Sequence, residues 1–151
     1  DGLVAAAVVA EGRVGIDVEY ISRNADCLEI AHKYFSPSEY TELQQLPDIQ
    51  MKERFFELWT LKEAYMKACG LGLSLPLDEV SFTFPPKSAG PTEPASILMK
   101  DDESWQLRLL SPSNLHKAAL CVCHNDDIPT KMIIKKTVPL VTEETFTMPE
   151  D

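Results

Sequence analysis

A long helix is the structural prediction that most constrains this chain. Its expected span, from about Asp48 to Cys69, follows Pro47 and ends before Gly70, a residue suited to the left-handed conformation that commonly terminates a helix. The side chains most suited to packing are distributed along the span: Phe55, Leu58, Trp59, Ala64, Tyr65 and Met66. We therefore expect this helix to pack against the strands predicted on either side of it in the sequence.

Charged side chains line one face of this helix and one face of a predicted strand. Trp59, Glu63 and Lys67 recur every four residues, so they share a helix face. Asp17 and Glu19 alternate in the strand upstream, so both carboxylates point to the same face of a sheet. Three carboxylates and one ammonium group on rigid elements suit a Mg²⁺ site that handles phosphate.

Taken alone, each of these patterns has an ordinary structural explanation. Glu63 and Lys67 form an i, i+4 pair that would contribute about 0.2–0.5 kcal/mol to a surface helix. Asp17 and Glu19 would be the polar face of a half-exposed strand. Trp59 is expected to pack, and to support the acidic side chains from the same helix face. The metal-site interpretation therefore depends on the sequence around these residues.

The other elements are predicted from cap residues, turn residues and hydrophobic periodicity. Ser36, Pro37 and Glu39 are typical of a helix start with a capping box, and an earlier helix is expected over residues 25–34. Strands are expected over residues 3–10, 13–19, 80–84, 104–110, 116–124 and 133–136, the first two joined by a tight turn at 11–12. A loop rich in Pro, Ser and Gly is expected over 85–94.

The order of strands, three helices and further strands predicts the α+β class. We expect an antiparallel sheet with three helices packed on one face. The chain of 151 residues agrees with one domain, assigned to residues 1–137, followed by a loose acidic tail over 138–151.

The charge and hydropathy exclude several classes of partner. A formal net charge of −10 disfavours nucleic acid and anionic membranes. No apolar run approaches the roughly 20 residues of a membrane helix, and the apolar opening over 3–10 lacks the basic region that starts a signal peptide. A cytoplasmic protein is expected.

Four sequence blocks resemble the signature blocks of the 4′-phosphopantetheinyl transferases. In chain order they are residues 14–19, 35–39, 56–67 and 70–75. The Trp-Thr-x-Lys-Glu-Ala spelling, the Leu-Ser-Leu-Pro-Leu run and a strand before Gly-Ile-Asp favour the surfactin-synthetase-activator (Sfp) type over the short acyl-carrier-protein synthase type. The resemblance covers roughly residues 3–125, and it is to the C-terminal, metal-bearing half of the Sfp type.

This resemblance implies transfer of the 4′-phosphopantetheine arm of coenzyme A to a serine of an acyl or peptidyl carrier protein, with release of adenosine 3′,5′-bisphosphate. Asp17, Glu19 and Glu63 match the acids that hold Mg²⁺ in the family. Glu63 is our first choice for the general base, and Glu19 is the alternative. Lys67 matches the lysine that binds phosphate, and Lys62 is given a lesser contact with the phosphate groups of coenzyme A.

An Sfp-type enzyme is built from two similar halves, and this chain resembles one of them. In the family, a Ser-His element and several basic residues ahead of the strand over 3–10 grip the nucleotide, and no basic cluster here replaces them. We therefore expect a partner, either the N-terminal half of the same protein or a second subunit. Two other functions are considered: a non-catalytic module that binds carrier proteins, and an unrelated Mg²⁺-dependent phosphohydrolase.

Overall fold

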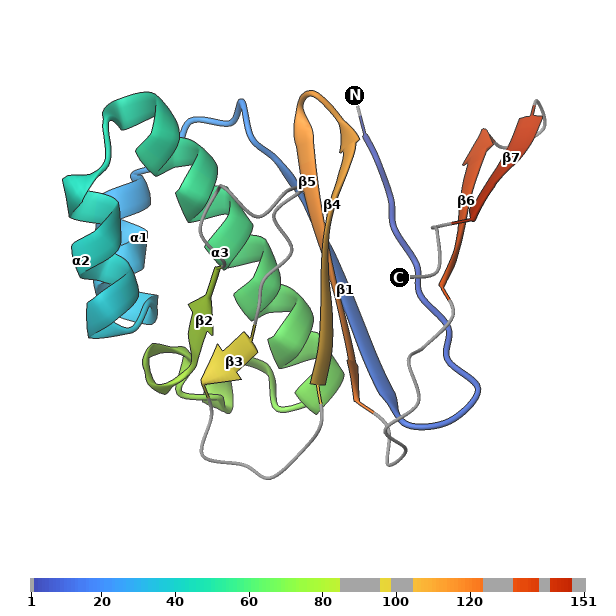
Figure 1. The fold of residues 1–151 in the computed structure, drawn as a ribbon, viewed down its shortest axis with the longest axis horizontal. Helices are drawn as coiled ribbons and strands as arrows, with labels where there is room; N and C mark the ends of the chain where they lie inside the picture. Colours follow the sequence, from blue (N-terminus) through green and yellow to red (C-terminus); the bar gives the residue numbers. More distant parts are fainter. Residues whose placement is uncertain (1, 85–95, 99–104, 124–131, 139–141, 148–151) are drawn as a thin grey trace.

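The computed structural model of this chain describes residues 2–84, 96–98, 105–123, 132–138 and 142–147. Its largest sheet has three antiparallel strands in the order β1-β5-β4 (Figure 1). These strands are β1 (Arg13–Tyr20), β4 (Trp105–Ser113) and β5 (His116–Cys123). β5 lies in the middle, so the acid-bearing strand β1 forms one side of this sheet.

The three helices lie on the same side of the sheet, as predicted, but in two layers. The helices are α1 (Cys27–Tyr34), α2 (Pro37–Gln45) and α3 (Asp48–Cys69). α3 packs on β1 and β5, whereas α1 and α2 pack against α3 on its side away from the sheet (Figure 1). The α+β prediction is confirmed, and α3 is the layer through which the other two helices connect to the strands.

Local sequence signals set the ends of α2 and α3. The Ser36 side chain accepts a hydrogen bond from the backbone N–H of Glu39, and the Glu39 side chain accepts one from the Ser36 N–H, which completes the predicted capping box. Gly70 ends α3 in the left-handed conformation with φ of 70°. The predicted and observed spans of α3 agree.

β1 and α3 approach each other most closely at Gly15. A Cβ atom at this position would lie 2.0 Å from the backbone oxygen of Ala64 and 2.5 Å from the backbone nitrogen of Ala68. Both contacts are with backbone atoms, so no side chain can move aside to make room. Glycine is therefore required at residue 15, and its absence of a side chain sets the spacing between the strand and the helix.

Short elements follow α3. Two 3₁₀ turns, η1 (Gly72–Ser74) and η2 (Leu77–Glu79), lead into a small antiparallel sheet of β2 (Ser81–Thr83) and β3 (Ser96–Leu98). The predicted loop over 85–94 lies outside the described residues. No helix in the described part of the chain is long and apolar enough to cross a membrane.

Two predictions about the ends of the chain are wrong. Residues 3–10, predicted as a strand, pair with no other strand in the described residues, although their exposure still alternates along the segment. The tail predicted to be loose contains β7 (Thr142–Thr147), which pairs with β6 (Ile133–Val138). In both cases the pattern of one segment alone did not show whether it pairs with another strand.

Replacing Gly15 by alanine is expected to destabilise the fold by about 3 kcal/mol, because the added methyl group overlaps the backbone of α3. Urea unfolding followed by circular dichroism measures the change. Gly2→Ala is the control, since a Cβ at Gly2 meets nothing within 4 Å. Equal unfolding midpoints for Gly15→Ala and the wild type would contradict the close approach.

Candidate active site

The acidic residues of β1 face α3. Gly15 contacts the α3 backbone, and side chains alternate along a strand, so Asp17 and Glu19 lie on the same face as Gly15. Asp17 is buried and Glu19 is partly buried. The neighbouring strand β5 places Ala119 opposite Asp17 and Lys117 opposite Glu19.

The predicted polar face of α3 meets these two acids. Lys67 forms an ion pair with Asp17, with 2.6 Å between Nζ and Oδ1. The indole Nε1 of Trp59 donates a hydrogen bond of 2.9 Å to Oε1 of Glu19. Glu63 lies between Trp59 and Lys67 on the same face of α3, and the charges of both strand acids raise its pKa. The strand and helix patterns therefore form one cluster.

Trp59 both packs and supports the cluster, as predicted. Its ring stacks with Phe55, with 6.2 Å between centroids, and with Phe35, with 6.3 Å, and it meets Tyr34 edge-on. Phe35 and Phe55 also stack on each other, with 5.4 Å between centroids, and packing against this group of rings leaves the indole little freedom to turn. The N–H group that holds Glu19 is thus fixed by aromatic packing.

The carboxylates of the cluster repel one another in a partly desolvated setting. Burial is the main cause that raises the pKa of Glu63, and the negative charges of Asp17 and Glu19 raise it further, against a lowering by Lys67. Burial also raises the pKa of Glu19, opposed first by Arg23. A bound cation would relieve both effects, because it favours the ionised form of each acid.

Asp17 carries the carboxylate oxygen that is most available to a metal ion. Its Oδ1 is bound by Lys67, whereas Oδ2 is buried and has no hydrogen-bond partner among the described residues. A buried carboxylate oxygen without a partner is costly unless something else binds it. Carboxylate oxygens are the ligands that Mg²⁺ prefers, and Mg²⁺ retains several waters, so few protein ligands suffice. The residues present fit this ion.

The acids do not yet form a complete coordination shell. Among the described residues, no group of three or more His, Cys, Asp or Glu side chains stands close enough together to hold a metal ion as placed. Lys67 occupies one oxygen of Asp17, and Trp59 occupies one oxygen of Glu19. Filling the site would therefore require some side chains to exchange these partners for the ion.

Arg23 also belongs to the cluster, although the sequence alone did not single it out. Its guanidinium lies 3.2 Å from Oε2 of Glu19 and stacks over the ring of Phe56 at 5.4 Å. Its Nε is buried and finds no hydrogen-bond partner in the part of the chain that the structure describes. The one available signal was the spacing of four residues from Glu19, which brings the two together because a turn follows β1 at Tyr20.

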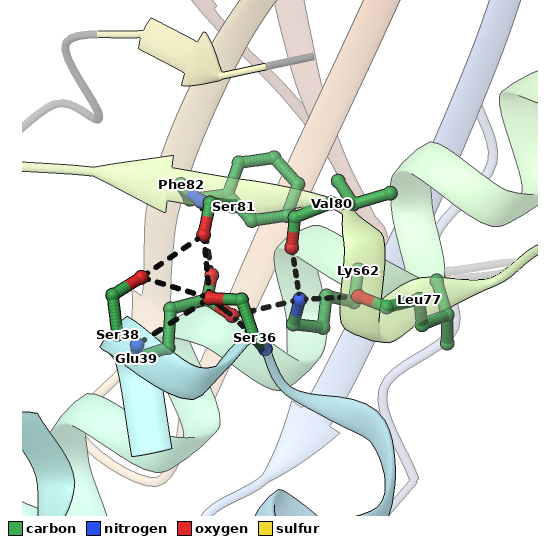
Figure 2. A network of polar contacts seen from close by, with 8 residues as sticks. All are labelled: Ser36, Ser38, Glu39, Lys62, Leu77, Val80, Ser81 and Phe82. Atoms are coloured by element: carbon green, nitrogen blue, oxygen red, sulfur yellow. Dashed lines mark hydrogen bonds and ion pairs between the residues drawn. The ribbon is translucent and has the colours of Figure 1, made fainter. Parts of the chain in front are cut away.

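Lys62, for which a contact with the phosphate groups of coenzyme A was predicted, lies outside the cluster. Its side chain is 0% exposed, and Nζ binds Oε2 of Glu39 at 2.8 Å and the backbone oxygens of Leu77 and Val80 at 2.8 and 2.6 Å. Figure 2 shows this network. An ammonium group has three donors, so none is left for a phosphate. The physical reason is helix geometry, since Lys62 points about 100° away from Glu63.

Comparison with protein families gives a decisive match. A family model described as the 4′-phosphopantetheinyl transferase superfamily matches residues 13–123, which include the whole acidic cluster and the Lys62 network. The chain belongs to this superfamily. The predicted resemblance is thereby confirmed.

Curated transferases of the superfamily are similar to the chain over part of their length. The 4′-phosphopantetheinyl transferase HetI of Nostoc sp. (strain PCC 7120) is 38% identical over 110 residues, which are 73% of this chain and 43% of HetI. The 4′-phosphopantetheinyl transferase Sfp of Bacillus subtilis (strain 168) is 34% identical over 114 residues, or 75% of this chain and 48% of Sfp. The matched part thus spans about half the length of these relatives.

Solved structures of smaller transferases share the fold. A holo-(acyl-carrier-protein) synthase from Bacillus anthracis, solved with CoA (3′,5′-ADP), aligns with a TM-score of 0.61 at 19% identity, covering 74% of this chain and 94% of that one. The holo-[acyl-carrier-protein] synthase from Helicobacter pylori, solved in complex with coenzyme A, aligns with a TM-score of 0.56 at 22% identity. The alignment covers 74% of this chain and 99% of that one. These similarities confirm the predicted architecture of helices on an antiparallel sheet.

Replacing Glu63 by glutamine is expected to stabilise the chain at neutral pH. Burial raises the pKa of Glu63 in the folded state above its usual value of 4.5, so the folded state binds the proton more tightly than the unfolded state. The free energy of unfolding then falls as the pH rises from 4.5 through the raised folded value, and Glu63→Gln abolishes that loss.

Urea unfolding at acid and at neutral pH measures this effect. The gain of Glu63→Gln over the wild type should appear at neutral pH and disappear below the usual pKa of glutamate. Glu79→Gln, on the exposed turn η2, is the control and should show no such gain. A Glu63→Gln variant that is less stable than the wild type at neutral pH would contradict the repulsion described here.

Proposed function

We propose that this chain is the metal-bearing half of an enzyme that transfers the 4′-phosphopantetheine arm of coenzyme A to a serine of an acyl or peptidyl carrier protein. Adenosine 3′,5′-bisphosphate would be released. The observation that carries the proposal is the cluster of Asp17, Glu19, Glu63 and Lys67 within the region matched by the superfamily. The names of the relatives and the ligands of the solved synthases support the substrate class.

Asp17, Glu19 and Glu63 are proposed to hold Mg²⁺. The partnerless Oδ2 of Asp17 and the raised pKa values of Glu19 and Glu63 support this role. When bound, Mg²⁺ would supply Lewis-acid neutralisation of the pyrophosphate oxygens of coenzyme A. β1 and α3 are each fixed in the core, so the acids are presented from rigid elements.

Glu63 is the better candidate for the general base. Both oxygens of Glu19 are engaged, Oε1 by Trp59 and Oε2 by Arg23. Glu63 makes no hydrogen bond to any described residue, and its pKa is raised toward the pH at which a base works most effectively. It would accept the proton of the carrier serine hydroxyl, directly or through a water molecule.

Lys67 is proposed to bind phosphate on the solvent side of the cluster. Its side chain is 48% exposed while Nζ contacts Asp17. An ammonium group carries three donors on a flexible stem, so one donor can stay on Asp17 while the others turn to a phosphate oxygen. Phosphoryl transfer depends on such charge neutralisation and positioning more than on covalent help from the protein.

A second half is proposed to grip the nucleotide of coenzyme A. The matched region covers 43% of HetI and 48% of Sfp, so more than half of each relative has no counterpart in the match. Within the described cluster, the cationic groups are Lys67 and Arg23, and each is paired with an acid. The contacts to the nucleotide phosphates are thus expected from the partner half or a second subunit.

The Glu63→Gln variant is expected to lower kcat for transfer by about 10²–10⁴-fold, the range typical of losing a general base. The assay mixes coenzyme A, Mg²⁺ and an apo carrier protein with this chain and its proposed partner half. Mass spectrometry then detects the gain of one phosphopantetheine arm on the carrier.

Glu53→Gln makes the same chemical change on an exposed position of α3 and should leave kcat near that of the wild type. A wild-type protein that modifies no carrier, across several carriers, would contradict the enzymatic function. If that protein still bound apo carriers, the non-catalytic binding module would be the function instead.

The chain alone is expected to bind coenzyme A weakly. Its net charge of −10 repels an anionic ligand, and the proposed nucleotide contacts belong to the partner. Isothermal titration with coenzyme A and Mg²⁺, with and without the partner half, measures the difference. Tight binding by a monomer of this chain would contradict the proposed division of the site.

A further inference from the structure

A buried ion pair outside the acidic cluster joins three separate segments of the chain. Glu39 lies in the first turn of α2, and Lys62 lies in the middle of α3. Oε1 of Glu39 accepts a hydrogen bond of 2.9 Å from the backbone N–H of Phe82, while Lys62 donates to the backbone of Leu77 and Val80 (Figure 2). The pair therefore fixes α2, α3 and the segment from η2 to β2 against one another.

Stability alone does not account for charged residues at this position. The pair is buried and flanked by two aromatic rings, with Nζ of Lys62 lying 5.2 Å from the ring centroid of Phe35 and 5.6 Å from that of Phe82. Apolar residues of similar volume often replace a buried ion pair with no loss of stability, or with a gain of about 1–4 kcal/mol. Apolar residues would not fix the relative orientation of the packed segments, because hydrogen bonds fix one geometry whereas dispersion contacts permit several.

The fixed orientation of Lys62 also restrains the orientation of Glu63, its neighbour in sequence. Lys62 and Glu63 are consecutive on α3, so their side chains project about 100° apart around the helix axis. On the sheet side, α3 is held at Ala64 and Ala68 by the contact with Gly15. The buried pair holds α3 on another side, and Glu63 projects between these two restraints.

A small rotation of α3 would disturb the acidic cluster. Side-chain ends lie about 5–6 Å from a helix axis, so a rotation of about 10° moves a carboxylate by about 1 Å. A displacement of about 1 Å can cost about 10²-fold in rate. Trp59 and Lys67 share the face of Glu63 and would move with it.

We propose that the buried Glu39–Lys62 ion pair is a positioning device that fixes the rotation of α3, and through it the direction in which Glu63 and Lys67 meet β1. The inference rests on the proposed function for its kinetic consequence. Neither residue touches the substrate. Their role is to hold the helix that carries the reacting groups.

Lys62→Met tests the proposal, because methionine keeps most of the volume while removing the charge. Glu39 would keep three donors, from the backbone and hydroxyl of Ser36 and the backbone of Phe82, so a folded variant is expected. We expect kcat for transfer to fall about 10- to 100-fold, with KM for the carrier protein changed by less than about twofold.

A spectroscopic measurement that needs no turnover accompanies the kinetics. In a Trp105→Phe background, Trp59 is the remaining tryptophan, and its indole binds the proposed metal ligand Glu19. Mn²⁺ should quench Trp59 fluorescence during a titration. The Mn²⁺ concentration at half-quenching should be low for the wild type and about tenfold higher for Lys62→Met. Leu43→Ala is the control. It creates a cavity one turn beyond Glu39, so it should lower the stability without raising the Mn²⁺ midpoint.

The double variant Glu39→Gln, Lys62→Met separates positioning from stability. It leaves no unpaired buried charge, so it should be at least as stable as Lys62→Met, while kcat and the Mn²⁺ midpoint stay impaired. If kcat and the Mn²⁺ midpoint were both at wild-type values, in Lys62→Met or in the double variant, the proposal would be overturned. Absence of transfer by the wild type would count against the proposed function instead, and the Mn²⁺ titration would still decide the positioning role.

Discussion

The close contact between β1 and α3 at Gly15 is the constraint on which the site depends. With the Cβ position of Gly15 only 2.0 Å from the Ala64 oxygen, the strand and helix backbones touch. At that spacing, short acidic side chains on β1 reach groups on α3, as the 2.6 Å pair of Asp17 and Lys67 shows. A strand held farther away by an ordinary side chain would leave the same residues on two separate surfaces.

This contact concentrates negative charge in a partly desolvated place. Lys67 and Arg23 offset some of it, yet burial and mutual repulsion still raise the pKa values of Glu19 and Glu63. Asp17 keeps one buried oxygen that no described residue binds. Such a cluster is poorly satisfied by the protein alone, which is the expected condition of a site built for a divalent cation and a phosphate group.

Local rules predicted the parts of this molecule that depend on local chemistry. The capping box of Ser36 and Glu39, the end of α3 at Gly70 and the shared face of Trp59, Glu63 and Lys67 were all readable from spacing. The lack of strand pairing at residues 3–10, the strand β7 and the partners of Lys62 were not. Each depends on pairing or packing beyond its own segment, and Lys62 in particular meets Glu39 and Val80 only after three segments have packed.

The acids of β1 and α3 are proposed to bind one divalent cation beside Trp59. Nuclear magnetic resonance of the two indole N–H groups during Mn²⁺ titration tests it most directly. Trp105 lies at the end of β4 opposite Cys123, about 20 Å along the sheet from Glu19. Substoichiometric Mn²⁺ is expected to broaden the Trp59 signal well before that of Trp105, and equal broadening of both signals, or of neither, would contradict a cation site beside Trp59.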